Sequence, residues 1–407
     1  MIRENYIPFN KEFLLEQQTT CFSENEKAAS FKKLFDIIEH YYHYEAFTLN
    51  RNLKQHYAAF DPDLSQRERK SYSSKSNFQV FKETLLTVLE QSNYHRLDQK
   101  TVEKSFKNSD LIGLKLSIDF NAFKDYEFYV RGHHKAKESV RKYYFWKKEI
   151  EIEYYDRVMI YLNYNEADYL DTKKVRLGKM PIDPGTIALK IFKRVPKNDI
   201  ETIFPNAVPK MSLKDKMLLW VPGIFGGVSL LSAKVIPALL NMYEAYQTGE
   251  TIDLLNSKTS LNQGLIALGI LAAYCFRQYN NFINKKIKYS KILSDSLYFK
   301  NLGNNSGAFY SLLNSSEEEI LKETILAYFF LYKTPHLTAV ELDNQIESWF
   351  KTHLNTELDF DVSDALLKLK NIGLGIENNG KWEVAALDQS LIIIDVLWDS
   401  VFDYNQQ

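Results

Sequence analysis

Two long apolar stretches, Met217–Tyr243 and Leu261–Phe276, stand out in this chain, because elsewhere hydrophobic residues are interspersed with polar ones. The first opens with uncharged residues as far as Ala233, and Lys234 then interrupts it. A helix needs about 20 mostly apolar residues to cross the core of a bilayer, and each stretch comes close to that length. The pattern therefore predicts a transmembrane helical hairpin over residues 217–279.

The charges that flank the hairpin predict its orientation. Lys214 and Lys216 precede the first stretch, and Lys285 and Lys286 follow the second. Between the stretches Lys258 is the one basic residue. Because positive charge collects on the cytoplasmic side of a membrane protein, we expect both termini in the cytoplasm, with the hairpin in the plasma or inner membrane.

Aromatic and small residues supply candidate positions at the membrane interface and in helix packing. Aromatic rings anchor at headgroup level, and small residues four apart let two helix backbones approach each other. The candidate residues are Trp220, Gly223, Gly227, Lys234, Tyr243, Gly269, Ala273, Tyr274 and Arg277. The alternative reading is an apolar hairpin buried in a soluble core, or a pair of re-entrant segments.

The chain before residue 110 carries helical periodicity. Apolar residues recur at three-four spacing in Ala28–Tyr44 and Ser76–Gln91, which predicts two amphipathic helices. The polar run between these two segments predicts a loop. We therefore expect an N-terminal helical region over residues 1–110.

From Leu111 the hydrophobic period changes from three-four to two. The runs LKLSIDF and YEFYVRG flank Lys124–Asp125 and predict a β-hairpin. Glu149–Tyr164 and Thr186–Phe192 read as further strands. The alternation predicts a mostly antiparallel β-rich region over residues 111–210, and an α+β fold class for the body of the protein.

The last part of the chain, residues 292–407, predicts a helical domain that ends in a hairpin and a further helix. The signals are capping boxes at Ser316–Glu319 and Thr338–Glu341, a helix cap at Asp361, a two-residue turn at Asn379–Gly380 and a last helix over Leu387–Phe402. Three helices followed by a hairpin is the order of a winged-helix domain, so we expect a winged-helix-like fold here.

Charge separates this domain from the rest of the chain. From Asn301 to the C-terminus there are 17 Asp and Glu against 6 Lys and no Arg, although the whole chain has a net charge of only −1. Nucleic-acid affinity rests largely on Lys and Arg, so the composition argues against nucleic acid as a partner of this domain. A protein partner, or the basic surface of the body, fits the charge better.

Two histidine pairs are the candidates for chemistry. His40 and His43 lie one helical turn apart and could share a metal, but a third ligand at suitable spacing is lacking, so a polar helix face is the favoured reading. His133 and His134 lie in the run RGHHKAKESVRKYYFWKK, where basic and aromatic residues alternate. That run could contact anionic lipid or RNA, and a solvated basic face is the alternative.

The run TIALKIFKRVPKNDIETIFPNAVPKMSLKDKMLLW, which leads directly into the first apolar stretch, resembles the transmembrane protein 143-like family. The resemblance covers about residues 154–282 and is most specific at LKIFKRVP and MSLKDK. It implies a membrane protein built on a domain of unknown function. It therefore assigns no catalytic residue to this chain.

No motif for a phosphate loop, a dinucleotide, a zinc protease or a serine hydrolase is present, so we expect no enzyme activity, cofactor or metal. Two cysteines exclude a disulfide framework. The function predicted is a membrane-anchored scaffold or regulator that acts through protein–protein contacts, with the lipid bilayer and a protein partner or a homo-oligomer as its partners. The alternatives are an oligomeric channel or transporter component, and a soluble nucleic-acid-binding regulator whose hairpin is core.

Overall fold

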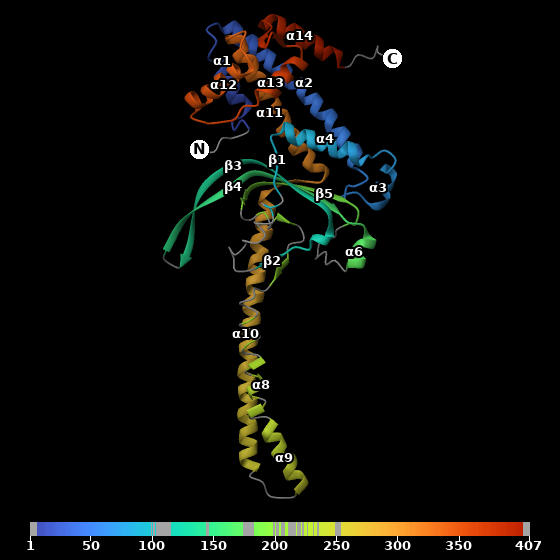
Figure 1. Ribbon diagram of the computed structural model, residues 1–407, viewed down its shortest axis with the longest axis vertical. Helices are drawn as coiled ribbons and strands as arrows, with labels where there is room; N and C mark the ends of the chain where they lie inside the picture. Colours follow the sequence, from blue (N-terminus) through green and yellow to red (C-terminus); the bar gives the residue numbers. More distant parts are fainter. Residues whose placement is uncertain are drawn as a thin grey trace. The chain divides into compact units, whose positions relative to one another are not determined.

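The computed structural model describes the chain at residues 6–98, 100, 102, 115–143, 146–173, 183–197, 200, 203–204, 208–210, 217, 221, 224–225, 227–230, 232–233, 236–248 and 254–401 (Figure 1). Internal contacts divide the chain into two compact units. Unit 1 consists of Met1–Val102, Phe120–Lys197 and Lys300–Gln407. Unit 2 consists of Glu103–Asp119 and Asn198–Phe299.

Unit 1 begins with four helices, which are α1 (Lys11–Thr19), α2 (Asn25–Tyr57), α3 (Gln66–Tyr72) and α4 (Phe78–Gln91). The side chains of Asn10, Ser65 and Asn77 accept hydrogen bonds from backbone N–H groups at the starts of α1, α3 and α4. In α2 the residues at three-four spacing, from Phe31 to Ile38, are buried as one stripe. Both helices predicted from periodicity are confirmed, and α2 extends well beyond its predicted end.

A five-stranded antiparallel sheet forms the centre of unit 1, in the order β1-β3-β4-β5-β7. Its strands are β1 (His95–Arg96), β3 (Phe123–Tyr143), β4 (Trp146–Tyr164), β5 (Ile187–Pro196) and β7 (Asn301–Asn304). The short elements η1 (Phe120–Ala122) and α6 (Ala167–Lys173) flank the sheet in sequence. The α+β class and the antiparallel sheet are therefore confirmed.

The hairpin predicted around Lys124–Asp125 is wrong. Those residues lie inside β3, which pairs along its length with β4. The segment predicted as its partner forms β2 (Lys115–Ser117) of unit 2 and pairs instead with β6 (Val208–Lys210). Alternation in the sequence shows which residues share a face of a strand, but it does not select the partner strand.

One face of the sheet is covered by helices α4 and α11 (Ser306–Lys333), as Figure 1 shows. Their shared core is aromatic. The ring of Tyr57 lies 5.1 Å from that of Phe81 and 5.2 Å from that of Phe309, and its hydroxyl donates to the carbonyl of Ile187 at 2.6 Å. This hydrogen bond satisfies a buried hydroxyl and ties the helices to β5.

The C-terminal part of unit 1 has the predicted order of helices and hairpin. After α11 come α12 (Ala339–Leu354), α13 (Val362–Asn371), β8 (Gly375–Asn378), β9 (Lys381–Val384) and α14 (Leu387–Ser400). An isolated bridge between Leu337 and Trp382 joins the segment before α12 to this hairpin. The capping box at Thr338, the cap at Asp361 and the Asn379–Gly380 turn are confirmed.

The capping box predicted at Ser316 is wrong, because α11 already begins at Ser306 and Ser316 is buried inside it. Helices α1 and α2 share one hydrophobic core with this C-terminal part. That core includes Phe31, Tyr328 and Phe350. Helices from the N-terminal and C-terminal parts of the chain are therefore packed together in unit 1.

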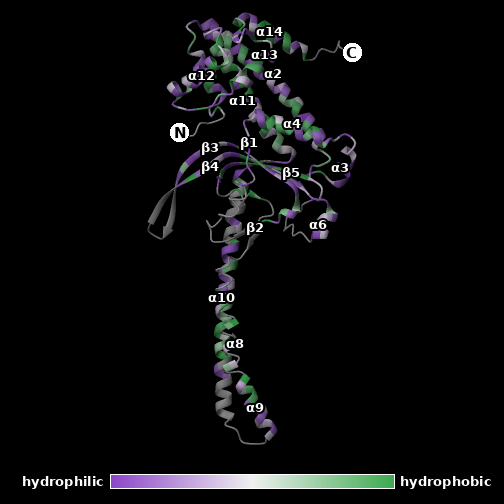
Figure 2. Cartoon of the chain, in the orientation of Figure 1, coloured by the Kyte–Doolittle hydropathy of each residue, from purple (hydrophilic) through white to green (hydrophobic). Residues whose placement is uncertain are grey.

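Unit 2 contains α8 (Gly227–Leu230), α9 (Ile236–Thr248) and α10 (Leu254–Lys300, of which Lys300 belongs to unit 1). Within the described residues, none of the helices combines the length and the apolar character needed to span a bilayer. Helix α9, which overlaps the first apolar stretch, has 13 residues where about 20 are needed. In the sequence of α10 polar residues flank the second stretch, and Figure 2 shows hydrophilic residues on the part of α10 that follows it.

This finding contradicts the predicted transmembrane hairpin. The predicted location in the plasma or inner membrane rested on that hairpin, and so did the orientation with both termini in the cytoplasm. Those predictions are corrected with it. Described residues of these stretches form helices α8, α9 and α10 of unit 2.

Candidate functional site

The structure describes only some of the residues predicted for the membrane interface and for helix packing. Trp220, Gly223 and Lys234 lie outside the described residues. The others lie on α8, α9 and α10, namely Gly227, Tyr243, Gly269, Ala273, Tyr274 and Arg277. A Cβ placed on Gly269 would meet no atom within 4 Å, so the described part of the chain packs nothing tightly against this glycine. A role of these residues in helix packing stays a prediction.

Helix α9 carries an exposed apolar stripe. Ile236, Leu239, Leu240 and Tyr243 are each exposed by about half, from 49% to 60%, and they recur at spacings of three and four residues. That spacing places them on one side of a helix. Glu244 is the one charged residue in the sequence of α9.

Helix α10 exposes large apolar side chains as well. Ile266 and Ile270, one turn apart, are 64% and 67% exposed, and Phe276 is 67% exposed. Patches of this kind on a folded protein usually mark a surface that a partner covers. Both helices therefore present large apolar side chains on the surface of unit 2.

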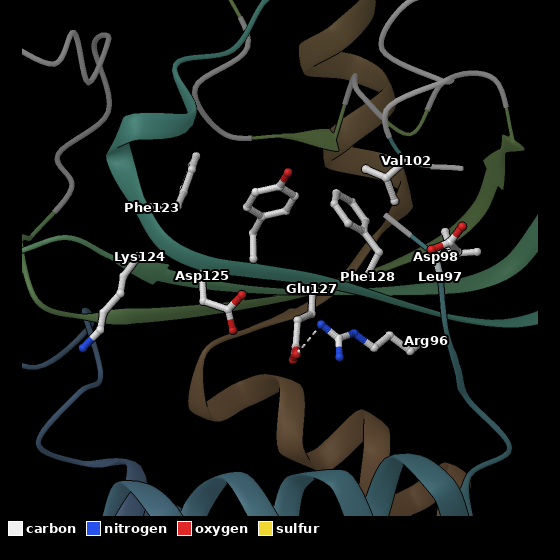
Figure 3. A pocket seen from close by; sticks show the side chains of 10 residues that line it. Arg96, Leu97, Asp98, Val102, Phe123, Lys124, Asp125, Glu127 and Phe128 are labelled. Carbon is white, nitrogen blue, oxygen red and sulfur yellow. Dashed lines mark ion pairs between the residues drawn. The ribbon is translucent and has the colours of Figure 1, made fainter. Parts of the chain in front are cut away.

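A polar cavity of about 540 Å³ lies beside β3 in unit 1 (Figure 3). Arg96 and Asp98 line it from the segment at and after β1, and Asp125 and Glu127 line it from β3. In Figure 3 these two carboxylates point to one side of the strand and the rings of Phe123 and Phe128 to the other. Alternation along β3 sets Phe128 on the side opposite Glu127, and Phe123 reaches that side because the strand register shifts between Phe123 and Asp125.

Glu127 is the most enclosed charge at this cavity, with a side chain 7% exposed. It forms ion pairs with Lys82 of α4 and, at 3.0 Å, with Arg96, and it accepts a hydrogen bond from the hydroxyl of Tyr129 at 2.8 Å. Burial acts to raise the pKa of Glu127, but these three partners outweigh it and hold the pKa below its ordinary value. The carboxylate is therefore kept ionised and paired, which suits a structural or binding role better than proton transfer.

The ammonium group of Lys82 also lies 3.6 Å from the centre of the Tyr161 ring. Sequence reasoning missed this cluster. The alternation around Asp125 and Glu127 could have placed both carboxylates on one face of β3. No signal in the sequence connected them with Lys82, which lies 45 positions before Glu127 on a different element.

The second histidine pair lies on β3 next to a backbone irregularity at Gly132, whose φ is +68°. His134 Nδ1 lies 2.6 Å from Asp156 Oδ1, and the hydroxyl of Tyr6 donates to the other carboxylate oxygen of Asp156 at 2.6 Å. His133 lies 3.3 Å from Glu153. These histidines are therefore engaged with carboxylates of the neighbouring strand β4.

The first histidine pair lies on α2. His43 contacts Glu317 of α11 at 3.1 Å, and His40 Nδ1 lies 2.5 Å from the carbonyl of Asp36. Within the described part of the chain, no group of three or more His, Cys, Asp or Glu side chains could hold a metal ion. Both histidines are exposed on α2, and the reading of this pair as a polar helix face stays a prediction.

Buried charges fasten the N-terminal segment to α11. Glu319 accepts a hydrogen bond from the backbone N–H of Ile7 at 2.7 Å and lies 2.9 Å from Lys322. Lys322 donates to the carbonyls of Ile7 and Phe9 at 2.8 and 3.3 Å. Glu319 and Lys322 are 0% and 3% exposed, so this pair is desolvated and depends on these contacts.

One turn further along α11, Glu323 pairs with Lys368 of α13 at 2.5 Å, and Lys368 pairs with Asp364 at the same distance. The side-chain amide of Asn93 donates to both Glu319 and Glu323, at 3.3 and 3.4 Å. Burial raises the pKa of Glu323 to about 7, although Lys368 opposes the shift. The network is a structural clamp between α11, α13 and the loop after α4.

Comparison with known proteins places part of this chain in a described family. No solved structure matches it. Residues 155–307, which run from β4 to the start of α11, match a family described as "Protein of unknown function (DUF3754)". The match supports the unknown-function domain that the sequence resemblance implied, and it gives no link to the transmembrane protein 143-like family or to a membrane hairpin. A DUF3754 domain is thus present over residues 155–307.

Proposed function

We propose that this protein is a scaffold or regulator that acts through protein–protein contacts. One observation carries the proposal, which is the exposed apolar surface of α9 and α10 in unit 2. The charged clusters of unit 1 support it indirectly, because Glu127 and Glu323 are each paired within the fold rather than set up for catalysis. The relationship of residues 154–282 to the transmembrane protein 143-like family is kept as part of the proposal and adds no activity.

The partner that fits this surface is a protein that presents an apolar helix face. The stripe on α9 has the spacing that helices use when they pack against one another, and its few charges leave burial as the main source of affinity. Removing a Leu side chain from water yields roughly 1.5–3 kcal/mol. A side chain that is half exposed before binding can contribute about half of that.

The test is recovery of a stoichiometric partner with the full-length protein isolated under native conditions. We expect the double variant Leu239→Ser/Leu240→Ser to weaken binding of that partner roughly thirtyfold and so to lower its recovery, since it removes about 2 kcal/mol of burial. Leu367→Ser is the matched control, because Leu367 on α13 and Leu240 are both 55% exposed. Equal recovery with all variants, or no reproducible partner of the wild-type protein, would refute the proposal.

A further inference from the structure

The polar cavity of unit 1 follows the edge of β3 at the place where β1 ends. Among the described residues, β1 pairs with β3 at Val130 and Tyr129, and the backbone N–H of Leu97 then donates to the carbonyl of Phe128 at 2.8 Å. The part of β3 that lines the cavity continues away from this pairing, from Phe128 to Phe123. Because successive side chains of a strand point to opposite faces, a cavity along its edge is reached by side chains from both faces.

The charge left over at this cavity is negative. Glu127 is neutralised by Arg96, at 3.0 Å, and by a lysine of α4. Asp98 and Asp125 are exposed, and neither forms an ion pair with a described residue. Lys124 is also exposed at the lining, but in Figure 3 its ammonium group points away from Asp125. Two carboxylates therefore remain for a cationic ligand to neutralise.

Aromatic rings form another part of the lining. Phe123 and Phe128 are 7% and 2% exposed, and the half-buried ring of Tyr126 lies 6.4 Å from that of Phe123. Rings of this kind give apolar contact to the body of a ligand, and their faces attract a cation. The cavity volume of about 540 Å³ lies within the range of small-molecule sites.

We propose that this cavity binds a small organic cation, an ammonium group carried on an aromatic or aliphatic body. The carboxylates of Asp98 and Asp125 accept hydrogen bonds from the ammonium group, and the rings cover its apolar body. A metal ion fits less well, because within the described residues no group of three or more His, Cys, Asp or Glu side chains could hold one. An organic anion would meet the same two carboxylates, while Arg96 is already engaged by Glu127.

Three probes with the same phenylethyl body separate the effect of charge from that of apolar burial. Isothermal titration of the full-length protein at about 50 mM salt compares phenethylammonium with neutral 2-phenylethanol and anionic 3-phenylpropionate. We expect phenethylammonium to bind with a Kd of about 1 mM or below, and the other two at least roughly tenfold more weakly. Phenethylammonium that does not bind at about 10 mM, or a neutral or anionic probe that binds as tightly, would overturn the inference.

Two substitutions locate the site. Asp98→Asn and Asp125→Asn each keep the size of the side chain and remove its charge. Each should weaken binding of phenethylammonium at least roughly threefold, and the double variant at least roughly tenfold. Both side chains are exposed, so the midpoint of urea unfolding should stay at the wild-type value, which shows that the variants are folded.

A matched control completes the test. Asp388→Asn removes the charge of an exposed aspartate on α14, away from the lining of the cavity. This control, and also Leu239→Ser/Leu240→Ser in unit 2, should bind phenethylammonium like the wild-type protein, so the result is independent of the proposed partner surface on α9. Asparagine variants that bind like the wild-type protein, or a control that loses as much affinity, would overturn the assignment to Asp98 and Asp125.

Discussion

Replacing Lys368 by Met should destabilise unit 1 far more than the same change at Lys370, two residues further along α13. Lys368 is 8% exposed and pairs with Glu323 and Asp364, each at 2.5 Å. Methionine fills a similar volume but removes the positive charge. Glu323, which is 3% exposed, would then be left buried without its counter-ion.

The size of the effect follows from the cost of an unpaired buried charge. Removing one partner of a buried ion pair typically costs about 3–5 kcal/mol in the free energy of unfolding. The remaining partner of Glu323 among the described contacts, Asn93, donates at 3.4 Å and offsets little of that cost. Lys370 is exposed, so Lys370→Met should cost less than about 0.5 kcal/mol.

The loss should also depend on pH in a definite direction. Burial raises the pKa of Glu323 to about 7, so the folded chain keeps a proton that the unfolded chain loses at lower pH. The contribution of this group to stability therefore falls as pH rises from its ordinary pKa near 4.5 towards 7. Without Lys368 the pKa of Glu323 rises further, so the variant should lose more stability at pH 8 than at pH 5.

Urea unfolding of the full-length protein, followed by tryptophan fluorescence at both pH values, measures these differences. Trp382 and Trp349 lie in the same part of unit 1 as Lys368 and report its unfolding. In a second background, Glu323→Gln, the cost of Lys368→Met should fall by at least about 1 kcal/mol, because no buried carboxylate is left unpaired. A loss that equals that of Lys370→Met, or one that is the same at pH 5 and pH 8, would refute the assignment of a buried charge clamp.

Two further substitutions test local features by the same unfolding assay. Gly132→Ala should cost about 3 kcal/mol, because φ is positive there and the new Cβ would lie 2.3 Å from Asp156 Oδ2. Gly380→Ala, where φ is also positive but nothing lies within 4 Å, should cost only about 1–2 kcal/mol, and equal losses would refute the steric argument. Thr338→Ala removes a capping box with Glu341 and should cost about 1 kcal/mol, whereas an unchanged midpoint would show that the cap contributes nothing.

The helix starts that the sequence predicted correctly depend on interactions between residues close together in the chain. At Thr338 the cap precedes an amphipathic run and nothing helical precedes it, so the helix begins where predicted. At Ser316 the same signal failed, because the apolar positions continue upstream through Phe309 and Leu312 and pack in the aromatic core. Because burial of these apolar side chains stabilises the helix upstream, the helix continues through the potential cap position. The hydroxyl of Ser316 donates to the side-chain oxygen of Gln91 instead.

The features that the sequence did not predict depend on contacts between distant segments. The pairing of β2 with β6 joins residues more than 90 positions apart, and the pairs Lys82–Glu127 and Lys368–Glu323 join separate elements. Periodicity shows which face of an element is buried, but not what covers it. The predicted membrane spans failed because an apolar run in the sequence does not by itself establish a helix long and apolar enough to cross a bilayer, and none is found among the described residues.

The proposed contact of α9 makes a definite prediction about salt. Burial of Leu239 and Leu240 against an apolar partner involves almost no charge, so salt should leave it unchanged or strengthen it. A salt titration of the full-length protein and its partner, with the Leu239→Ser/Leu240→Ser variant in parallel, measures this dependence. An association that weakens steeply as salt rises from about 50 to about 500 mM, or one that the variant leaves unchanged, would refute the assignment of the contact to the apolar stripe of α9.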